Sequence, residues 1–177
     1  AVDGAIAAAA MLTVVEPLVA AEVVGVVLVT QRRIAEQLGA LPPGVFVAWN
    51  EDESSEMIDS VRIGLRTWAA CEPVGARDGF LVCPADQPGI TTGDFDACIT
   101  AFREAPRSIV IASYAGRRGH PVICPAALAA FVQSTACDQG LNALPRAFAE
   151  AVVVVECHSP GVTRDVDTPG DCGRAPA

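Results

Sequence analysis

The stretch GFLVCPADQP, residues 79–88, is the part of the sequence that decides the fold. Its first half, Phe80–Cys83, is short and uniformly apolar, as expected of a strand that is buried on both faces of a parallel sheet. A proline-containing turn follows at once and contains Asp86. In open α/β sheets, ligands bind beyond the carboxyl ends of the strands. The segment therefore predicts a central strand with a carboxylate at the end where a ligand would bind.

The rest of the chain repeats this alternation of short apolar runs and amphipathic stretches. In the helix expected at 93–104, Thr92 is the predicted N-cap. Strands that alternate with helices indicate βαβ units. The expected fold is α/β, with a mostly parallel sheet and helices on both faces, in one domain over residues 1–171 followed by a frayed tail at 172–177. Strands are expected at 25–30, 45–48, 80–83, 108–112 and 151–156, and helices at about 8–22, 31–38, 56–70, 93–104, 125–135 and 140–149.

The composition argues against several classes of function. The 177 residues include 12 Lys+Arg and 21 Asp+Glu, which gives a net charge of −9. Binding to nucleic acid or to an anionic membrane surface runs on excess positive charge, so neither is expected. Every cation is Arg, which excludes a Schiff-base lysine and a Walker-type phosphate loop. Only 5% of the residues are aromatic, too few for a platform that stacks bases.

The seven cysteines point to a reducing compartment. Their number is odd and no two form a CxxC pair, so neither a disulfide framework nor a zinc site is predicted. Most of them are expected to be small buried side chains. The longest apolar stretches, Ala5–Leu12 and Ala151–Val155, are too short to span a bilayer, and no basic region precedes the first. A cytoplasmic protein without a membrane partner is therefore expected.

Three aspartates are candidate ligands of a hard cation. Asp86 follows the central strand, and Asp165 and Asp167 lie two residues apart, which places both on one face of an extended segment. Mg²⁺ is held by one or two carboxylates together with substrate phosphates, so a fold that joins these segments would clamp Mg²⁺ on a nucleotide. The alternative is purely local: Asp86 would be a turn residue and the later aspartates would cap a final helix.

A second candidate is GRRGHP, residues 116–121, which is expected to be a loop between strands. Guanidinium groups match phosphate bidentately and glycine lets a backbone approach a ligand, so Arg117 and Arg118 are candidate phosphate ligands. The alternative is a solvated hairpin connection in which His120 bonds locally. Ser54, Ser55 and Ser60 could likewise offer hydroxyls to an anion or simply cap a helix.

Several stretches, taken in order, resemble the MobA-like NTP transferase family, with molybdenum cofactor cytidylyltransferase as the most similar type of member. The resemblance covers about residues 11–171 and is specific because DQP, GRRGHP and DVDTPGD occur together in this order. The matching stretches are 11–30, Asn50 with 56–65, LVCPADQPGIT (81–91), YAGRRGHPVIC (114–124), DQGLNAL (138–144) and DVDTPGD (165–171).

The resemblance implies a Rossmann-like nucleotidyltransferase fold and a role for each motif. Asp86 of DQP would bind Mg²⁺, with Gln87 beside the substrate, and Asp165 with Asp167 would hold the metal and the nucleotide. Further substrate-binding residues are implied near the acceptor and the nucleotide; these are Arg117, Arg118, Gly119, His120 and Pro121, and Asn50, Ser60 and Gly64.

One departure from the family pattern leaves two functions open. The family's glycine-rich loop, LAAGxSxRMGxxK, and the first central strand have no counterpart in these residues. Either the sequence is a fragment that begins after that loop, or the protein is a degenerate relative. The first hypothesis is an enzyme that transfers a nucleoside monophosphate from CTP, or GTP, to a phosphorylated acceptor such as molybdopterin, and releases pyrophosphate. The second is a non-catalytic module that binds a nucleotide or pterin and serves a client molybdoenzyme.

Overall fold

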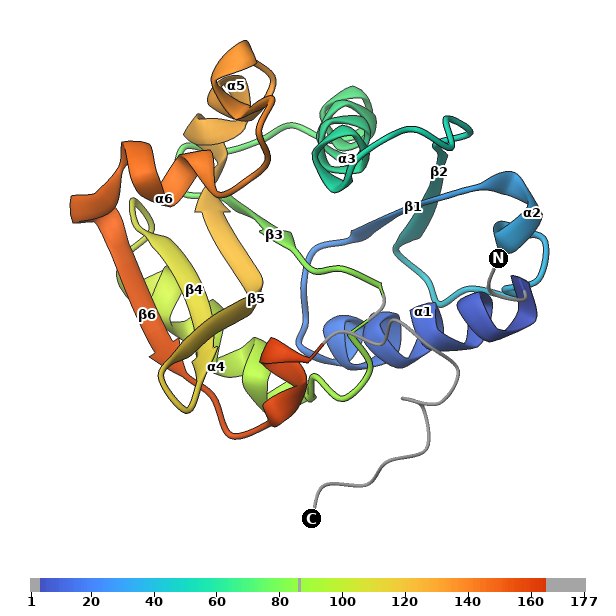
Figure 1. Cartoon of the computed structure of the whole chain (residues 1–177), viewed down its shortest axis with the longest axis horizontal. Coiled ribbons are helices and arrows are strands. Elements are labelled where there is room, and N and C mark those ends of the chain that lie inside the picture. Colours follow the sequence, from blue (N-terminus) through green and yellow to red (C-terminus); the bar gives the residue numbers. More distant parts are fainter. Residues whose placement is uncertain (1–3, 86, 165–177) are drawn as a thin grey trace.

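A computed structural model describes residues 4–85 and 87–164, and Figure 1 shows helices on two sides of a central layer of strands. This confirms the α/β class with helices on both faces. The strands are β1 Val26–Thr30, β2 Val45–Trp49, β3 Gly79–Val82, β4 Ile109–Tyr114, β5 Arg117–Pro125 and β6 Val152–Glu156. The α-helices are α1 Gly4–Ala20, α2 Arg32–Ala35, α3 Met57–Cys71, α4 Thr92–Glu104, α5 Ala129–Val132 and α6 Ala143–Ala147. Four 3₁₀ turns complete the described elements: η1 Ala126–Leu128, η2 Thr135–Cys137, η3 Ala149–Ala151 and η4 Pro160–Thr163.

The strands form two sheets. One is the parallel pair β1–β2, and the other has the order β3-β5-β4-β6. In the second sheet β5 pairs antiparallel with both β3 and β4, whereas β4 and β6 are parallel. It follows that β3, β4 and β6 run in one direction and β5 alone is reversed. Only half of the strand pairings are parallel, which corrects the expectation of a mostly parallel sheet.

The reversed strand β5 is the element that the sequence pattern missed. Residues 117–121 are in this strand, not in a loop, and a tight turn at Ala115 and Gly116 joins it to β4. Both turn residues have positive φ, 50° and 75°, as hairpin turns of this kind require. The motif GRRGHP therefore begins in the turn and continues along an antiparallel strand.

Alternating side chains of the four-stranded sheet fill two separate cores. In β4, Ile109 and Ile111 belong to the cluster that also contains Leu144 and the partners from α3, α5 and α6. The residues between them, Val110 and Ala112, belong to the cluster built with α1 and α4. All four are at most 4% exposed. Full burial of one such large side chain contributes about 1.5–3 kcal/mol, so the two cores fix the sheet between its helical layers.

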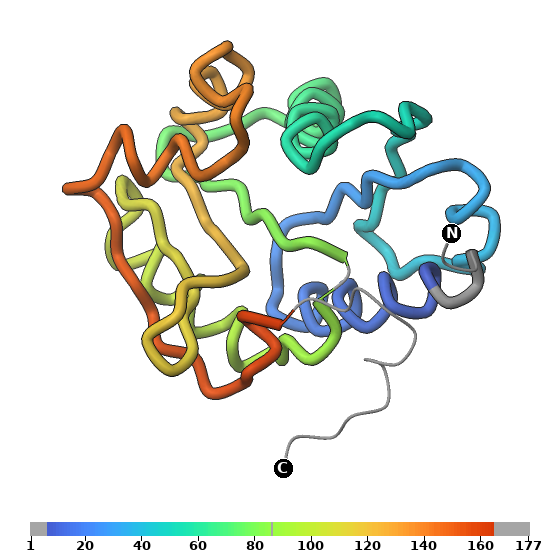
Figure 2. Tube along the Cα trace, viewed as in Figure 1, coloured from blue at the N-terminus to red at the C-terminus, as the bar shows by residue number. Residues whose placement is uncertain are grey.

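Among the described residues, no strand pairs with both β1 and β3 to join the two sheets. Within them β1 pairs only with β2, and β3 pairs only with β5. Helices α1 and α3 nevertheless pack on both sheets. Helix α3 contributes Ile58 to the core of the larger sheet, and its Gly64 faces Val29 of β1. Helix α1 contributes Val14 to the core of the larger sheet and Val15 to the core that contains Leu28 of β1. In Figure 2, the dark blue coil of α1 runs from beside the β1–β2 pair toward the yellow-green coil of α4, in line with its contacts to both cores.

Local sequence explains where the helices begin and end. Helix α4 begins after Thr91, one residue earlier than predicted, because the Thr91 hydroxyl accepts from the Asp94 amide at 3.3 Å and the Asp94 carboxylate accepts from the Thr91 amide at 2.9 Å. The stretches 31–38, 125–135 and 140–149 contain shorter helices than expected, flanked by 3₁₀ turns in the last two cases.

Candidate functional site

The loops that follow β3, β4 and β6 meet at one edge of the larger sheet. Because these three strands share a direction, their carboxyl ends lie on the same side, and β5 begins there. The converging segments are residues 83–85 and 87–91, the turn at 115–116 and residues 157–163. This is the edge at which open α/β sheets bind ligands.

Two glycines bring the segment after β3 against the segment after β6. A Cβ placed on Gly161 would overlap the Gly89 carbonyl group and would lie 2.6 Å from the Ile90 nitrogen. The Ser159 hydroxyl donates to the Gly89 carbonyl oxygen at 2.6 Å. The two segments are therefore in direct backbone contact, and only glycine fits at position 161.

A third glycine brings β5 into the same contact. A Cβ on Gly119 would overlap the Val162 carbonyl oxygen and would lie 2.6 Å from the Val162 carbonyl carbon. Between the pairs Ile111–Val122 and Ser113–Arg118, β5 has three residues, 119–121, opposite the single residue 112 of β4. This bulge turns the backbone of β5 toward η4, as bulges beside active sites commonly do. We call Gly89, Gly119, Ser159, Gly161 and Val162 the loop junction.

Asp94, which the sequence analysis did not select, is bonded to the segment after β6. One carboxylate oxygen, Oδ2, accepts from the Thr91 amide and hydroxyl at 2.9 and 2.7 Å. The other, Oδ1, accepts from the amides of His158 and Ser159 at 3.2 and 3.3 Å. The pattern Thr91-x-x-Asp94 could have identified Asp94 as part of a helix cap. It does not predict the hydrogen bond from the His158 amide, which lies 64 residues away in the sequence.

The predicted metal ligands Asp86, Asp165 and Asp167 lie outside the described residues. Their neighbours in the sequence are described: Gln87 is 3% exposed, and Arg164 closes η4. Among residues 4–85 and 87–164, no three His, Cys, Asp or Glu side chains gather closely enough to hold a metal ion.

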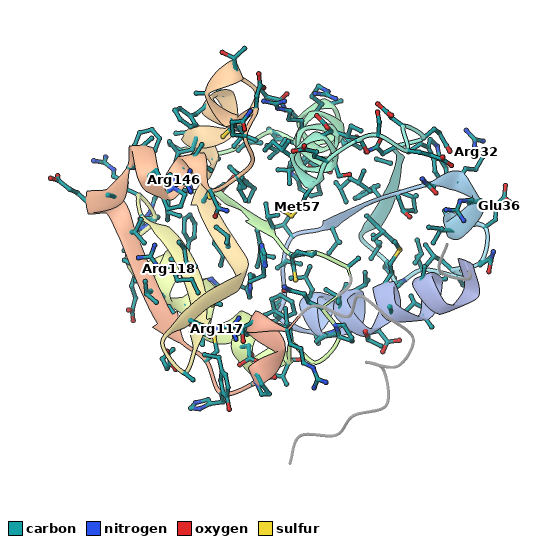
Figure 3. All side chains as sticks on the ribbon, viewed as in Figure 1. Arg32, Glu36, Met57, Arg117, Arg118 and Arg146 are labelled. Atoms are coloured by element: carbon teal, nitrogen blue, oxygen red, sulfur yellow. The ribbon has the colours of Figure 1, made fainter. Side chains whose placement is uncertain are left out.

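The predicted phosphate ligands Arg117 and Arg118 are both exposed in β5 and are labelled in Figure 3. They pair regularly with Tyr114 and Ser113 of β4. Consecutive strand residues point to opposite faces, so the two guanidinium groups do not serve one ligand from the same side. His120 is half-buried and Pro121 is buried within the bulge.

A carboxylate anchors the turn that precedes these arginines. The Ser113 hydroxyl donates to Glu156 at 2.6 Å, across the parallel pair β4–β6. This hydrogen bond is the main reason that the pKa of Glu156 lies below its ordinary value, and the backbone amides of Ala115 and Gly116 lower that pKa further. The end of β6 therefore fixes the turn from which Arg117 extends.

The predicted nucleotide-side residues form a second group. The Asn50 side-chain amide donates to the hydroxyls of Ser55 and Ser60 at 2.9 and 3.1 Å, which ties the end of β2 to α3. Gly64 faces β1, since a Cβ there would lie 3.4 Å from Val29. At the end of β1, the Thr30 hydroxyl is buried and has no hydrogen-bond partner among the described residues.

A pocket of about 470 Å³ opens between α3 and the segment around η2. Arg62 forms its floor: the guanidinium donates to the Val132 and Ser134 carbonyls at 2.9 and 2.8 Å, and to Asp138 at 2.7 Å. Asn50 reaches this pocket, whereas the loop junction does not line it. The full lining is Asn50, Asp52, Ser55, Asp59, Arg62, Ile63, Arg66, Gln133, Thr135 and Asp138.

The cysteines belong mainly to the core, as the sequence predicted. Cys98, Cys124, Cys137 and Cys157 are buried, Cys83 is partly buried and Cys71 is exposed. Burial, with a smaller contribution from the nearby Cys137, raises the pKa of Cys124 to about 12. Burial also raises the pKa of Cys157, whose sulfur lies 4.0 Å from that of Cys98. Thiols of this kind stay protonated, so these cysteines are not activated nucleophiles.

Similarity to known proteins extends over most of the chain. The sequence matches the MobA-like NTP transferase domain over residues 8–152. No curated protein matches it.

In the part of the chain that the structure describes, no helix has the length and apolar composition needed to cross a bilayer.

Solved structures share the fold at low sequence identity. Rv0371c from Mycobacterium tuberculosis has a TM-score of 0.69 and 22% identity, with 94% of this chain and 80% of that chain covered. Its complex with manganese gives 0.70 and 20%, with 92% and 83% covered. A nucleotidyl transferase from Methanothermobacter thermautotroptrophicus gives 0.68 and 17%, with 92% and 76% covered.

Proposed function

The chain belongs to the MobA-like NTP transferase family, and from this premise we propose that it transfers a nucleoside monophosphate from CTP to a phosphorylated acceptor, molybdopterin. The observation that carries the proposal is the loop junction, because it joins the segment after β3 to the segment after β6 at the ligand-binding edge of the sheet. In the sequence, Asp86 belongs to the first segment, and Asp165 and Asp167 follow the second.

The donor set fits a hard divalent cation. Asp86 stands three residues before Gly89, and Asp165 follows Arg164 directly, so carboxylates flank the junction on both sides in the sequence. Carboxylate oxygens are the ligands that Mg²⁺ and Mn²⁺ prefer. The manganese complex of the structurally similar Rv0371c is consistent with a divalent metal in this fold. When bound, Mg²⁺ would offset the negative charge of the triphosphate.

In the proposed reaction, an oxygen of the acceptor phosphate forms a bond to the α-phosphorus of the nucleotide. The bond from that phosphorus to the bridging oxygen breaks, and pyrophosphate leaves with the electron pair. Such a transfer depends on positioning and charge neutralisation rather than on a covalent intermediate. This chain contributes the carboxylates Asp86, Asp165 and Asp167, and the arginines of β5.

We assign the acceptor to the side of the junction formed by β5. Arg117 or Arg118 would bind the acceptor phosphate, and the bulge at Gly119, His120 and Pro121 would shape the acceptor site. Thr30 at the end of β1, Asn50 after β2 and Ser60 of α3 would face the nucleotide. Gln87, next to Asp86 in the sequence, would be a further substrate-binding residue. The product would then pass to a client molybdoenzyme in the cytoplasm.

One observation favours the second candidate, a binding module without transfer activity. Among the described residues, no strand joins β1 to β3, so the parallel pair β1–β2 stands apart from the four-stranded sheet. Such a module would bind CTP or a pterin without releasing pyrophosphate. The two candidates thus differ in one measurable product.

A pyrophosphate-release assay tests the proposal. The chain is incubated with Mg²⁺, molybdopterin and either CTP or GTP, with Asp86→Asn as the matched variant. We expect pyrophosphate release with CTP that requires both metal and acceptor and is lost in the variant. Saturable nucleotide binding without pyrophosphate would establish the binding module. Equal release by Asp86→Asn would refute the role of this carboxylate.

A further inference from the structure

We propose that Asp94 is a positioning residue that holds the segment after β6 against the segment after β3, and so sets how the acidic ligands on the two segments meet. This role rests on the proposed function, since it concerns the same metal-binding edge. Asp94 itself is in the first turn of α4, and its carboxylate bonds to backbone amides rather than to a ligand.

The two oxygens of the Asp94 carboxylate act in different directions. A helix cap needs only one of them, and Oδ2 fills that role by accepting from Thr91 at 2.7 and 2.9 Å. Oδ1 accepts instead from the consecutive amides of His158 and Ser159, immediately before η4. The single side chain therefore connects the start of α4, which follows the DQP segment, with the residues that lead toward Asp165.

The connection depends on a carboxylate. Asp94 is only 2% exposed, and the four hydrogen bonds of its carboxylate are all accepted, from one hydroxyl and three backbone amides. An ionised carboxylate has two accepting oxygens, whereas an amide side chain accepts at one end and donates at the other. In Asp94→Asn, the new NH₂ group would face either Thr91 or the amides of 158 and 159. One of the two sides then loses its acceptor.

The Ser159 side chain forms a second link between the segments after β3 and β6. The Ser159 hydroxyl donates to the Gly89 carbonyl at 2.6 Å and accepts from the Gly161 amide at 3.0 Å. Asp94 thus fixes the amide of Ser159, and the Ser159 side chain fixes the DQP segment. Mutation of a residue that hydrogen-bonds to a metal ligand typically changes metal affinity or activity by about 10–100-fold. Asp94 and Ser159 act through the backbone beside the predicted ligands, so we expect an effect at the lower end of this range.

The test is Mn²⁺ binding to the whole chain, followed by the electron paramagnetic resonance signal of free Mn²⁺, in four proteins: wild type, Asp94→Asn, Ser159→Ala and the control Thr91→Ala. The control removes the cap hydroxyl of α4 but keeps both bonds to Oδ1. We expect Asp94→Asn and Ser159→Ala to weaken Mn²⁺ binding about ten-fold or more. Thr91→Ala should lower the melting temperature, as loss of a cap does, and change Mn²⁺ affinity by less than about two-fold.

Hydrogen exchange distinguishes positioning from loss of folding. The amides of His158 and Ser159 should exchange faster in Asp94→Asn than in Thr91→Ala, while the amides of β4 stay protected in both. Mn²⁺ affinities of Asp94→Asn and Ser159→Ala that equal that of wild type would overturn the positioning role alone. The same holds if Thr91→Ala loses as much affinity as Asp94→Asn. A wild-type chain that binds no Mn²⁺ would instead refute the proposed function and this role together.

Discussion

Replacing Gly119 by alanine is the sharpest test of the contact between β5 and η4. The added Cβ would overlap the Val162 carbonyl oxygen and would lie 2.6 Å from its carbonyl carbon, whereas real Cβ contacts are essentially never under 3.0 Å. The obstacle is backbone, so no side-chain rotation relieves it. Strand β5 is held on both sides by β3 and β4. The η4 turn must therefore move away from the sheet.

The cost of this movement follows from what η4 buries. Val162 is fully buried in the core shared with α1 and α4. Withdrawing such a side chain costs about 1.5–3 kcal/mol. Overpacking that shifts backbone adds to this, typically by about 1–3 kcal/mol. We expect the free energy of unfolding of Gly119→Ala to fall by about 3 kcal/mol or more.

Urea unfolding followed by circular dichroism measures this change, with Gly93→Ala as the matched control. A Cβ on Gly93 meets nothing closer than the Thr91 hydroxyl at 3.7 Å, an ordinary contact. Alanine in the first turn of α4 should be neutral or stabilising by up to about 1 kcal/mol. A Gly119→Ala protein within about 0.5 kcal/mol of wild type would refute the packing described for β5 and η4.

Three further predictions concern other parts of the molecule. Folding raises the pKa of the Cys124 thiol from 9.0 to about 12, so the buried thiol should favour the folded state fully below pH 9 and progressively less as the pH rises toward 12. Between pH 8 and pH 10.5, the free energy of unfolding measured in urea should fall by about 2 kcal/mol more in wild type than in Cys124→Ala. An equal fall in the two proteins would contradict the raised pKa. Arg62→Leu removes the side-chain donor to the Val132 carbonyl and the ion pair with Asp138, while the Ser134 carbonyl keeps the Cys137 amide as a donor. The free energy of unfolding should therefore fall by about 2 kcal/mol, and an unchanged urea midpoint would show that the guanidinium is dispensable. Arg117→Ala should raise the KM for the phosphorylated acceptor about ten-fold and leave the KM for the nucleotide unchanged. Steady-state kinetics with each substrate varied in turn measures both constants, and a raised nucleotide KM with an unchanged acceptor KM would contradict the assignment.

The strands that the sequence predicted correctly are those whose composition matches their burial. Ile109–Ala112 is buried on both faces and reads as an uninterrupted apolar run. Strand β5 was missed because its first residues, Arg117 and Arg118, are exposed in a hairpin and carry no apolar pattern. Its pairing with β3 and β4 comes from tertiary contacts, which override the local signal.

The candidate site divides in the same way. Two described residues next to or within the predicted motifs contact the segment after β6: Gly89, which follows DQP, lies against Ser159 and Gly161, and Gly119 of GHP lies against Val162. Asp94 was not predicted to be part of this arrangement, since its local pattern describes a helix cap and its second set of bonds spans 64 residues. Close approaches such as that of Gly161 to Gly89 are invisible in a single sequence for the same reason.

Titration calorimetry with CTP and GTP, with and without Mg²⁺, tests the central claim most directly when it is made on the wild-type chain and on Asp86→Ala. The account predicts that CTP binds only in the presence of Mg²⁺ and that this binding disappears in Asp86→Ala. Binding that is independent of Mg²⁺ and unchanged in the variant, or no binding of either nucleotide, would contradict a metal-dependent nucleotide site at this edge of the sheet.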